Sequence, residues 1–372
     1  MKTKAAVVYE AGKPIEIEEL DLDGPRDGEV LIRYTHAGLC HSDVHVAHGD
    51  LEARLPMVLG HEGAGIIEEV GPGVTRVKPG DHVVCSFIPN CGTCRYCASG
   101  QQSICDMGAT ILEGYLPGER FAWSGPRGDY GAMCMLGTFS QYGVIHQNSA
   151  VKVDDDLPLD KAVLVGCGVP TGWGSAVNTA NVRPGQTVVV IGVGGIGINA
   201  VQGARYAGAK NVIAIDPLEN KREKAMELGA THSFASMDEA AMGAIAEMTR
   251  GQMADAAILT PGLMTSEIVA GGFHSVGKGG TVVLTGLNKL MEQNIELPGT
   301  ILTLYRKSIK GSLFGDCNPT TDIPKILGLY QSGDLKLDEI ITRTYTLDQV
   351  QEGYDDLLAG KNVRGVVVHE HS

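Results

Sequence analysis

The chain has 372 residues, of which 43% are apolar and 20% charged, a balance typical of globular proteins. Because single cores rarely grow beyond about 250–300 residues, this length favours two domains. The formal net charge of −14 excludes the basic surface that nucleic-acid binding requires.

The N-terminal part of the chain is predicted to be rich in β-strands. Short apolar stretches over Glu29–Thr35, Gly65–Val70 and His82–Ser86 are separated by turns rich in glycine, proline and aspartate. This spacing predicts a small barrel-like β domain. The segment Asp106–Gly137 has the least regular pattern, and we expect a long surface loop there.

From about Pro170 the pattern changes to strands that alternate with helices. Strands are predicted over Thr187–Ile191, Asn211–Ile215, Ala254–Leu259 and Gly280–Thr285, with helices over Ile198–Ala207 and Lys221–Leu228. This alternation implies βαβ units and a doubly wound parallel sheet, so the predicted fold class is α/β. The C-terminal region is predicted to form helices over Ile323–Ser332 and Asp348–Ala359 and a closing strand over Arg364–His369.

Two uncharged runs, Ala162–Val182 and Pro184–Ala204, are long enough to span a bilayer. Glycines interrupt both, and the second divides into a strand, a turn and an amphipathic helix, so we predict no transmembrane helix. The N-terminal apolar stretch Ala5–Tyr9 is too short for a secretory signal. We therefore expect a cytoplasmic protein with no membrane or nucleic-acid partner.

Four cysteines follow a C-x2-C-x2-C-x7-C pattern, at Cys91, Cys94, Cys97 and Cys105. Such spacing lets one loop place four sulfurs around a single point, as a closed tetrahedral zinc site requires. Disulfides or a redox dithiol are the alternatives, but disulfides belong mostly to oxidising compartments. We predict a structural zinc site.

A G-x-G-x-x-G motif lies between the first predicted strand of the second region and its helix, and Asp216 ends the next strand. In this context the motif predicts a dinucleotide site with the phosphates at the helix N-terminus. Asp216 would bind the ribose hydroxyls and repel a 2′-phosphate, which favours NAD, although Lys221 and Arg222 are near enough to soften the repulsion. A glycine turn without a ligand is the alternative. The predicted contacts within the motif are Gly192, Gly194, Gly195, Ile196 and Gly197.

Three further potential zinc ligands, Cys40, His61 and Cys167, each stand beside glycine or polar residues. Two thiolates and one imidazole would leave a fourth position open, as a catalytic zinc requires. Spacing alone does not show that the three converge, because a buried cysteine is usually a small hydrophobe. A lone histidine is also more often a packing residue than a ligand.

The sequence around Gly60, His61, Glu62 and Gly65 resembles the signature of zinc-dependent medium-chain alcohol dehydrogenases. The cysteine quartet is similar to the structural zinc lobe of that family. The segment Gly166–Gly172 resembles its third catalytic-zinc segment, so the resemblance implies that Cys40, His61 and Cys167 share one catalytic zinc.

The likeness runs from Lys4 to about Val368 and implies a division into two domains. Residues 1–168 and 314–372 would form a β-rich GroES-like catalytic domain with both zinc sites. Residues 169–313 would form a Rossmann NAD-binding domain.

Four stretches are similar to one bacterial branch of this family, the nicotinoprotein alcohol dehydrogenases that are assayed with nitrosodimethylaniline. In that branch NAD(H) stays bound and is recycled in place, so the resemblance implies the same here. The stretches are Cys105–Ala109, Leu136–Ser140, Asp322–Lys325 and Gly360–Gly365.

The resemblance also implies how the reaction would run. Zinc would act as a Lewis acid on the substrate hydroxyl, and hydride would pass to the nicotinamide. Ser42 corresponds to the hydroxyl that contacts the reacting oxygen, and His45 to the terminal imidazole of a proton relay. Asp43 corresponds to the carboxylate that orients His61, and Glu62 to the carboxylate behind the metal.

Further roles follow from the same likeness. His41 corresponds to a residue that faces the cofactor pyrophosphate, where many relatives have arginine. Other implied cofactor contacts are Thr171, Lys221, Gly286 and Arg364. The implied apolar pocket residues are Leu51, Phe87 and Leu136.

An apolar pocket beside a metal favours uncharged primary alcohols and their aldehydes as substrates. One alternative is a formaldehyde-active relative, either dismutating or thiol-adduct-dependent, in which Arg120 and Arg127 would bind an adduct carboxylate. Another is a non-catalytic protein that binds nucleotide and zinc. Because Ile301–Phe314 resembles the family segment that pairs across subunits, we expect a homodimer or homotetramer.

Overall fold

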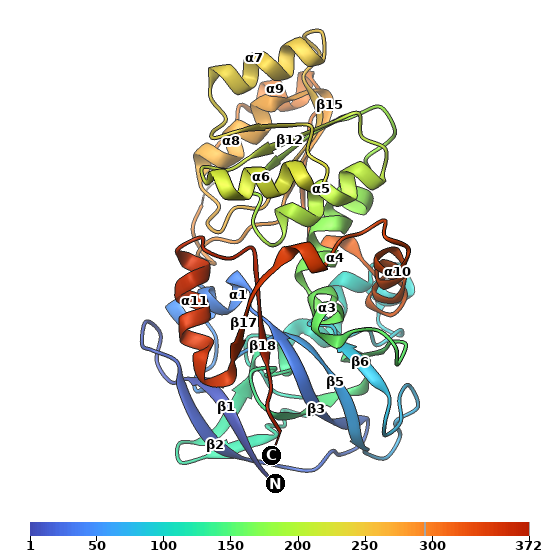
Figure 1. The fold of residues 1–372 in the computed structure, drawn as a ribbon, viewed down its shortest axis with the longest axis vertical. Helices are drawn as coiled ribbons and strands as arrows, with labels where there is room; N and C mark the ends of the chain where they lie inside the picture. Colours follow the sequence, from blue (N-terminus) through green and yellow to red (C-terminus); the bar gives the residue numbers. More distant parts are fainter. Residues whose placement is uncertain (294, 372) are drawn as a thin grey trace. The chain divides into compact units, whose positions relative to one another are not determined.

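The computed structural model describes residues 1–293 and 295–371, which form two compact units (Figure 1). Unit 1 comprises Met1–Cys167 and Asn318–Ser372, and unit 2 comprises Gly168–Cys317. Which ligands each unit binds stays a prediction.

Unit 1 contains a closed barrel with the strand order β1-β2-β7-β8-β4. Its core includes Leu20, Trp123 and Tyr130, which are almost fully buried. The strands are β1 (Lys2–Val8), β2 (Glu16–Leu22), β4 (Met57–Val58), β7 (Trp123–Gly125) and β8 (Gly128–Ala132).

A second sheet in unit 1 has the order β10-β6-β5-β3-β18-β17, and β9 also pairs with β3. In Figure 1 the red strand β18 runs beside the blue strand β3, because the C-terminal strand pairs antiparallel with it. The strands are β3 (Glu29–Gly38), β5 (Glu62–Val70), β6 (His82–Cys85), β9 (Tyr142–His146), β10 (Ala150–Lys152), β17 (Ile341–Thr346) and β18 (Arg364–Val368).

The register between β3 and β5 decides where the site lies. Gly38, the last residue of β3, pairs with Glu62, the first residue of β5. The chain therefore leaves β3 toward Cys40 at the same edge at which it enters β5 from His61. Two potential ligands far apart in sequence are thus brought together by strand pairing.

Among its described residues, unit 1 has five α-helices beside these sheets. Gly49 ends the first of them, α1, with a φ of 82°, a left-handed conformation that glycine adopts without strain. The helices are α1 (His41–His48), α2 (Arg95–Ala98), α3 (Leu159–Ala162), α10 (Pro319–Ser332) and α11 (Val350–Leu358).

Unit 2 is built on a six-stranded sheet with the order β13-β12-β11-β14-β15-β16, in which every neighbouring pair is parallel. The order in which successive strands join the sheet reverses between β11 and β14, and sheets of this type bind ligands at the carboxyl edge beside such a point. The strands are β11 (Thr187–Ile191), β12 (Asn211–Ile215), β13 (His232–Phe234), β14 (Ala254–Leu259), β15 (Val276–Leu284) and β16 (Ser308–Gly311). The helices are α4 (Gly168–Gly174), α5 (Gly197–Tyr206), α6 (Glu219–Glu227), α7 (Glu239–Met248), α8 (Ser266–Ser275) and α9 (Gly299–Leu304).

The prediction of a surface loop over Asp106–Gly137 is wrong. Strands β7 and β8 of the barrel fall in this segment, and Leu116, Trp123 and Tyr130 lie in the barrel core. For the prediction that neither uncharged run is a transmembrane helix, the structure agrees: no helix among the described residues has both the length and the apolar character to cross a bilayer.

Candidate active site

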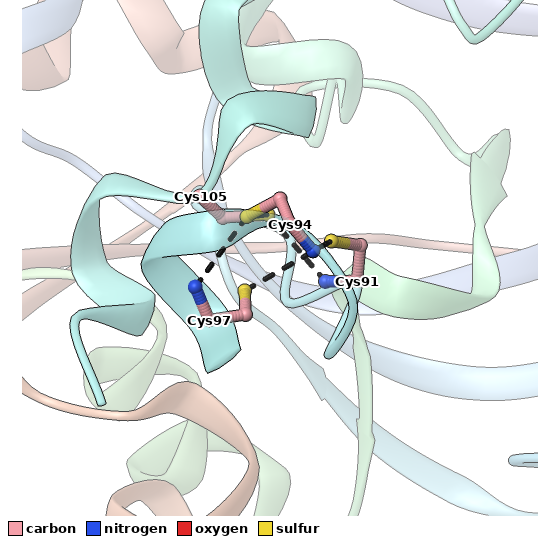
Figure 2. A group of neighbouring side chains, drawn as sticks. All are labelled: Cys91, Cys94, Cys97 and Cys105. Carbon is pink, nitrogen blue, oxygen red and sulfur yellow. Dashed lines mark hydrogen bonds between the residues drawn. The ribbon is translucent and has the colours of Figure 1, made fainter. Parts of the chain in front are cut away.

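The four cysteines of the predicted structural zinc site lie together in unit 1 (Figure 2). Their sulfurs are within 4.8 Å of one another, with Cys91 and Cys97 sulfurs 3.9 Å apart and Cys94 and Cys105 sulfurs 4.0 Å apart. Thiolates about 2.3 Å from a tetrahedral zinc lie about 3.8 Å from each other. The spacing therefore fits four ligands of one zinc ion, and all four thiols are free rather than paired in disulfides.

Backbone N–H groups surround these sulfurs. The amides of Cys94 and Cys97 donate to the sulfurs of Cys91 and Cys94 at 3.3 and 3.4 Å, and the amide of Cys91 donates to Cys105 at 3.4 Å. Although burial opposes it, donation from the amides of Thr93 and Cys94 lowers the pKa of Cys91 to about 6. These amides thus favour the thiolate at Cys91, the form that zinc binds, whereas burial raises the pKa of Cys97 and raises that of Cys105 to about 12.

A second cluster in unit 1 contains Cys40, His61, Glu62 and Cys167, whose ligand atoms lie within 4.8 Å of one another. Cys40 precedes α1, His61 and Glu62 stand at the start of β5, and Cys167 follows a short turn of helix. All four side chains are buried. The structure therefore brings together the three residues that spacing alone left apart.

The charges of this cluster suit a cation. The hydrogen bond with Cys167, together with the nearby His61, holds the pKa of Cys40 well below its ordinary value despite burial. The same bond and burial raise the pKa of Cys167 well above its ordinary value. A cation in the cluster would stabilise both thiolates and release the remaining proton.

His61 supplies an independent test of the fit. Its Nε2 is buried and makes no hydrogen bond with any described residue, which is costly for a polar atom unless a ligand binds there. Burial favours the neutral ring, but the charges of Asp43 and Cys40 outweigh it and raise the pKa of His61 well above its ordinary value. The donor set of two sulfurs and one imidazole nitrogen is one that zinc prefers.

One carboxylate, Asp43, borders the cluster, and another, Glu62, belongs to it. Asp43 Oδ2 lies 3.2 Å from His61 Nδ1, at ion-pair distance but without hydrogen-bond geometry, and Asp43 Oδ1 accepts the amide of Gly60 at 2.9 Å. Glu62 is fully buried and accepts from the guanidinium of Arg364. The side chain of Arg364 is thus held beside the cluster within unit 1.

The predicted relay residues lie on α1. Ser42 Oγ is 3.7 Å from Cys40 Sγ, so the hydroxyl borders the cluster. The Nδ1 atom of His45 lies 2.9 Å from Asp50 Oδ2, and the ring of His41 lies 5.2 Å from that of His45. Of the pocket residues, Phe87 packs edge-on against the His61 ring at 6.0 Å, Leu136 is buried, and Leu51 is half-buried.

The glycine motif forms the turn between β11 and α5 of unit 2. A Cβ at Gly197 would lie 1.9 Å from the carbonyl oxygen of Gly192, so only glycine lets the helix start so close to the strand. A Cβ at Gly194 would meet only the Lys221 ammonium, at 3.8 Å. Gly194 thus leaves its side of the turn open, and Lys221 reaches the same turn. Gly195 and Ile196 complete the turn ahead of α5.

Asp216 stabilises this turn directly. Its Oδ2 accepts the amide of Val193 at 3.0 Å, and its Oδ1 accepts the amide of Leu218 at 2.9 Å. Each carboxylate oxygen has a second lone pair for another donor. Thr171, in α4, and Gly286, after β15, also belong to unit 2.

Arg120 does not fit the role that the formaldehyde alternative gave it. Its guanidinium is buried, pairs with the buried carboxylate of Glu29 and donates to the carbonyl of Gly24 at 2.9 Å. It therefore anchors its own segment to the start of β3 and to the loop that contains Gly24, and it is not available to an adduct carboxylate. Arg127 lies over the ring of Tyr9, 3.7 Å from its centroid.

Sequence reasoning missed Tyr354, a buried tyrosine of α11 whose pKa is raised well above its ordinary value by burial and by the nearby charge of Asp43. No local pattern marks it, because Tyr354 is far from Cys40, His61 and Cys167 in the sequence. Cys85, Cys134 and Cys317 had no predicted role, and all three are buried thiols.

Two family models match the chain. The one described as "Alcohol dehydrogenase GroES-like domain" matches residues 26–155, and the one described as "Zinc-binding dehydrogenase" matches residues 195–332. The predicted fold class, a doubly wound parallel sheet plus a β-rich GroES-like domain, is confirmed.

Curated relatives match over nearly the whole chain. An "NDMA-dependent alcohol dehydrogenase" of Amycolatopsis methanolica is 63% identical over 99% of both chains. "Alcohol dehydrogenase B" of Mycobacterium tuberculosis is 47% identical over 99% of this chain and 98% of that protein. The predicted resemblance to the nitrosodimethylaniline-dependent enzymes is thereby confirmed.

Solved structures agree with these relatives. The crystal structure of a benzyl alcohol dehydrogenase from Acinetobacter calcoaceticus covers 100% of both chains with a TM-score of 0.93 and 30% identity. An alcohol dehydrogenase zinc-binding domain protein from Burkholderia ambifaria gives the same TM-score and coverage at 33% identity. This chain therefore belongs to the zinc-dependent alcohol dehydrogenase family.

Proposed function

We propose that this alcohol dehydrogenase oxidises uncharged primary alcohols at a zinc held by Cys40, His61 and Cys167. The observation that carries the proposal is the convergence of two sulfurs and a buried, unpaired imidazole nitrogen within 4.8 Å. The quartet of Cys91, Cys94, Cys97 and Cys105 would hold a second, structural zinc. When bound, the catalytic zinc supplies a Lewis acid that stabilises negative charge on the substrate oxygen.

The protein groups around the catalytic cluster have distinct tasks in this proposal. Asp43 orients the His61 ring, and Arg364 neutralises Glu62 so that the carboxylate can stay buried behind the cluster. The ring of Phe87 provides an apolar surface beside His61. Such a wall discriminates only weakly, by about 1–3 kcal/mol per methylene, so we expect a broad range of uncharged alcohols.

The cofactor that we propose for unit 2 is NAD(H), whose oxidised form accepts the hydride from the alcohol. The open face of Gly194 and the N-terminus of α5 suit a pyrophosphate, and Lys221 adds a positive charge beside the turn. The carboxylate of Asp216 would bind ribose hydroxyls and repel a 2′-phosphate. Thr171, Gly286, His41 and Arg364 remain proposed contacts on the resemblance alone.

We propose that the cofactor stays bound, because the chain is similar to a relative named as NDMA-dependent. An added acceptor can reoxidise a cofactor that does not leave its site. We expect purified protein, once denatured, to release NAD(H) and the zinc of both clusters. Metal analysis and mass spectrometry of the released nucleotide measure both. A protein that emerges without dinucleotide and needs added NAD contradicts retention, and released NADP(H) contradicts the role of Asp216.

We further propose that Ser42 and His45 carry the proton away from the substrate. His45→Gln should lower turnover about 10-fold or more at low pH and much less at high pH, where hydroxide can take the proton directly. The pH dependence of kcat measures the effect. His48→Gln is the matched control, since His48 is exposed on the same helix. An unchanged pH profile in His45→Gln would remove the relay role.

A homo-oligomer in the cytoplasm completes the proposal. Strand β16 stands at the end of the parallel sheet, and apolar side chains near it are exposed, among them Leu304, Tyr305 and Leu313. An unpaired edge beside exposed apolar groups suits a second copy of the chain. Light scattering distinguishes a dimer or tetramer from a monomer, which would contradict this part.

A further inference from the structure

Helix α11 places one tyrosine among the groups that support the proposed catalytic zinc. The side chain of Tyr354 is 3% exposed, and its ring packs edge-on against the buried ring of Phe139 at 6.0 Å. The preceding Gly353 lets the helix approach closely, because a Cβ there would lie 2.5 Å from Leu39 Cδ1. Leu39 directly precedes Cys40, so α11 is packed against the segment that carries a proposed ligand.

The hydroxyl at the end of this ring is buried and makes no hydrogen bond with any residue that the structure describes. Asp43 Oδ2 is also buried and makes no hydrogen bond with a described residue, whereas Oδ1 of the same carboxylate accepts the amide of Gly60 at 2.9 Å. Buried polar atoms are almost always paired, and leaving one unpaired is costly. Two such atoms in electrostatic contact are therefore matched partners, one a donor and the other an acceptor.

We infer that Tyr354 is a positioning residue whose hydroxyl donates to Asp43 Oδ2 and thereby fixes this carboxylate against Nδ1 of His61. Asp43 would then be held at both oxygens, by the amide of Gly60 and by the phenol. A carboxylate held in this way has little freedom to rotate away from the imidazole. The orientation of the His61 ring is thus set by a chain of contacts that begins on α11.

The electrostatics of the site agree with this direction of donation. Burial and the negative charge of Asp43 raise the pKa of Tyr354 well above its ordinary value. The phenol therefore keeps its proton and acts as a donor to the carboxylate. It does not take part in the proton transfer that we assign to Ser42 and His45.

This inference rests on the proposed zinc site, and metal binding rather than turnover tests it most directly. Replacing a group that orients a metal ligand commonly lowers metal affinity or activity by about 10–100-fold. Because Tyr354 acts through Asp43, we expect Tyr354→Phe to speed the release of the catalytic metal to a chelator by about 5–10-fold. We also expect a shifted visible spectrum when cobalt replaces the catalytic zinc. Release from the cysteine quartet should not change.

A matched control and a second background make the test specific. Tyr345 is also a buried tyrosine of unit 1, but its hydroxyl bonds to Asp356 and Asn362, so Tyr345→Phe should leave metal release and the cobalt spectrum unchanged. In an Asp43→Asn background, Tyr354→Phe should have little further effect, since interacting residues are not additive.

The outcomes separate the two proposals. If Tyr354→Phe matches the wild type in metal release and cobalt spectrum, or if it acts equally in both backgrounds, the positioning role is wrong although the zinc site stands. A lower melting temperature with an unchanged spectrum also contradicts the role. If the wild type holds no metal at Cys40, His61 and Cys167, the proposed zinc site and this inference fail together.

Discussion

Cys40→Ser is expected to lower kcat/KM for alcohol oxidation by about 1,000-fold or more, because a Lewis acid contributes several kcal/mol to charge stabilisation and each 1.36 kcal/mol is about tenfold in rate. Serine does not supply the thiolate that Cys40 offers, and the hydrogen bond with Cys167 that favours the thiolate is lost with it. Metal analysis should show that the variant has lost the zinc of this cluster and kept that of the quartet.

Cys317→Ser is the matched control for Cys40→Ser. Cys317 is a fully buried thiol of unit 2 that contacts the carbonyl oxygens of Pro170 and Gly315 and belongs to neither cluster. Its replacement should leave the zinc content intact. A Cys40→Ser protein that keeps its full zinc content and normal turnover would contradict the proposed ligand set.

The second large effect is expected in stability. Cys97→Ser should release the zinc of the quartet and lower the melting temperature by on the order of 10 °C, since structural zinc contributes its binding free energy to folding and about 1 kcal/mol corresponds to 2–4 °C at this size. The lobe has little else to hold it, because α2 has four residues and Cys97 alone among them is buried. Calorimetry and metal analysis measure the two changes.

Ser99→Ala provides the control in the same lobe, because Ser99 is exposed and its hydroxyl donates to the carbonyl of Tyr96 and accepts from the side-chain amide of Gln101, neither of which is a cysteine of the quartet. It should retain the zinc and the melting temperature. If Cys97→Ser keeps both as well, the quartet does not hold a structural metal. Mass spectrometry of alkylated protein would then reveal whether the cysteines form disulfides.

Three strands of unit 2, β11, β12 and β14, could be predicted from sequence to the residue, because they are largely apolar, as expected for strands buried on both faces of a parallel sheet. The prediction for β15 missed its first residues, and β13 and β16 were not predicted. The barrel strands β7 and β8 could not be predicted. They are short and rich in glycine, and their pairing with β2 and β4 is set by residues distant in the chain.

The two metal clusters also differ in how far they could be predicted from the sequence. The quartet is local, so its spacing was sufficient for the prediction. The convergence of Cys40 and His61 depends on the pairing of β3 with β5, which no spacing rule reveals, and only the family resemblance indicated it. Arg120 was misjudged for a similar reason, because its segment was expected to be a surface loop and its buried partner Glu29 is distant in sequence.

The two backbone hydrogen bonds of Asp216 bear on any attempt to engineer the coenzyme preference of this enzyme. Replacing Asp216 with a small neutral residue would remove the proposed repulsion of a 2′-phosphate but would also leave the amides of Val193 and Leu218 without this acceptor. A redesign that keeps the carboxylate and adds positive charge nearby would preserve the loop. The proposed coenzyme selectivity and the hydrogen bonding of this loop thus depend on the same side chain.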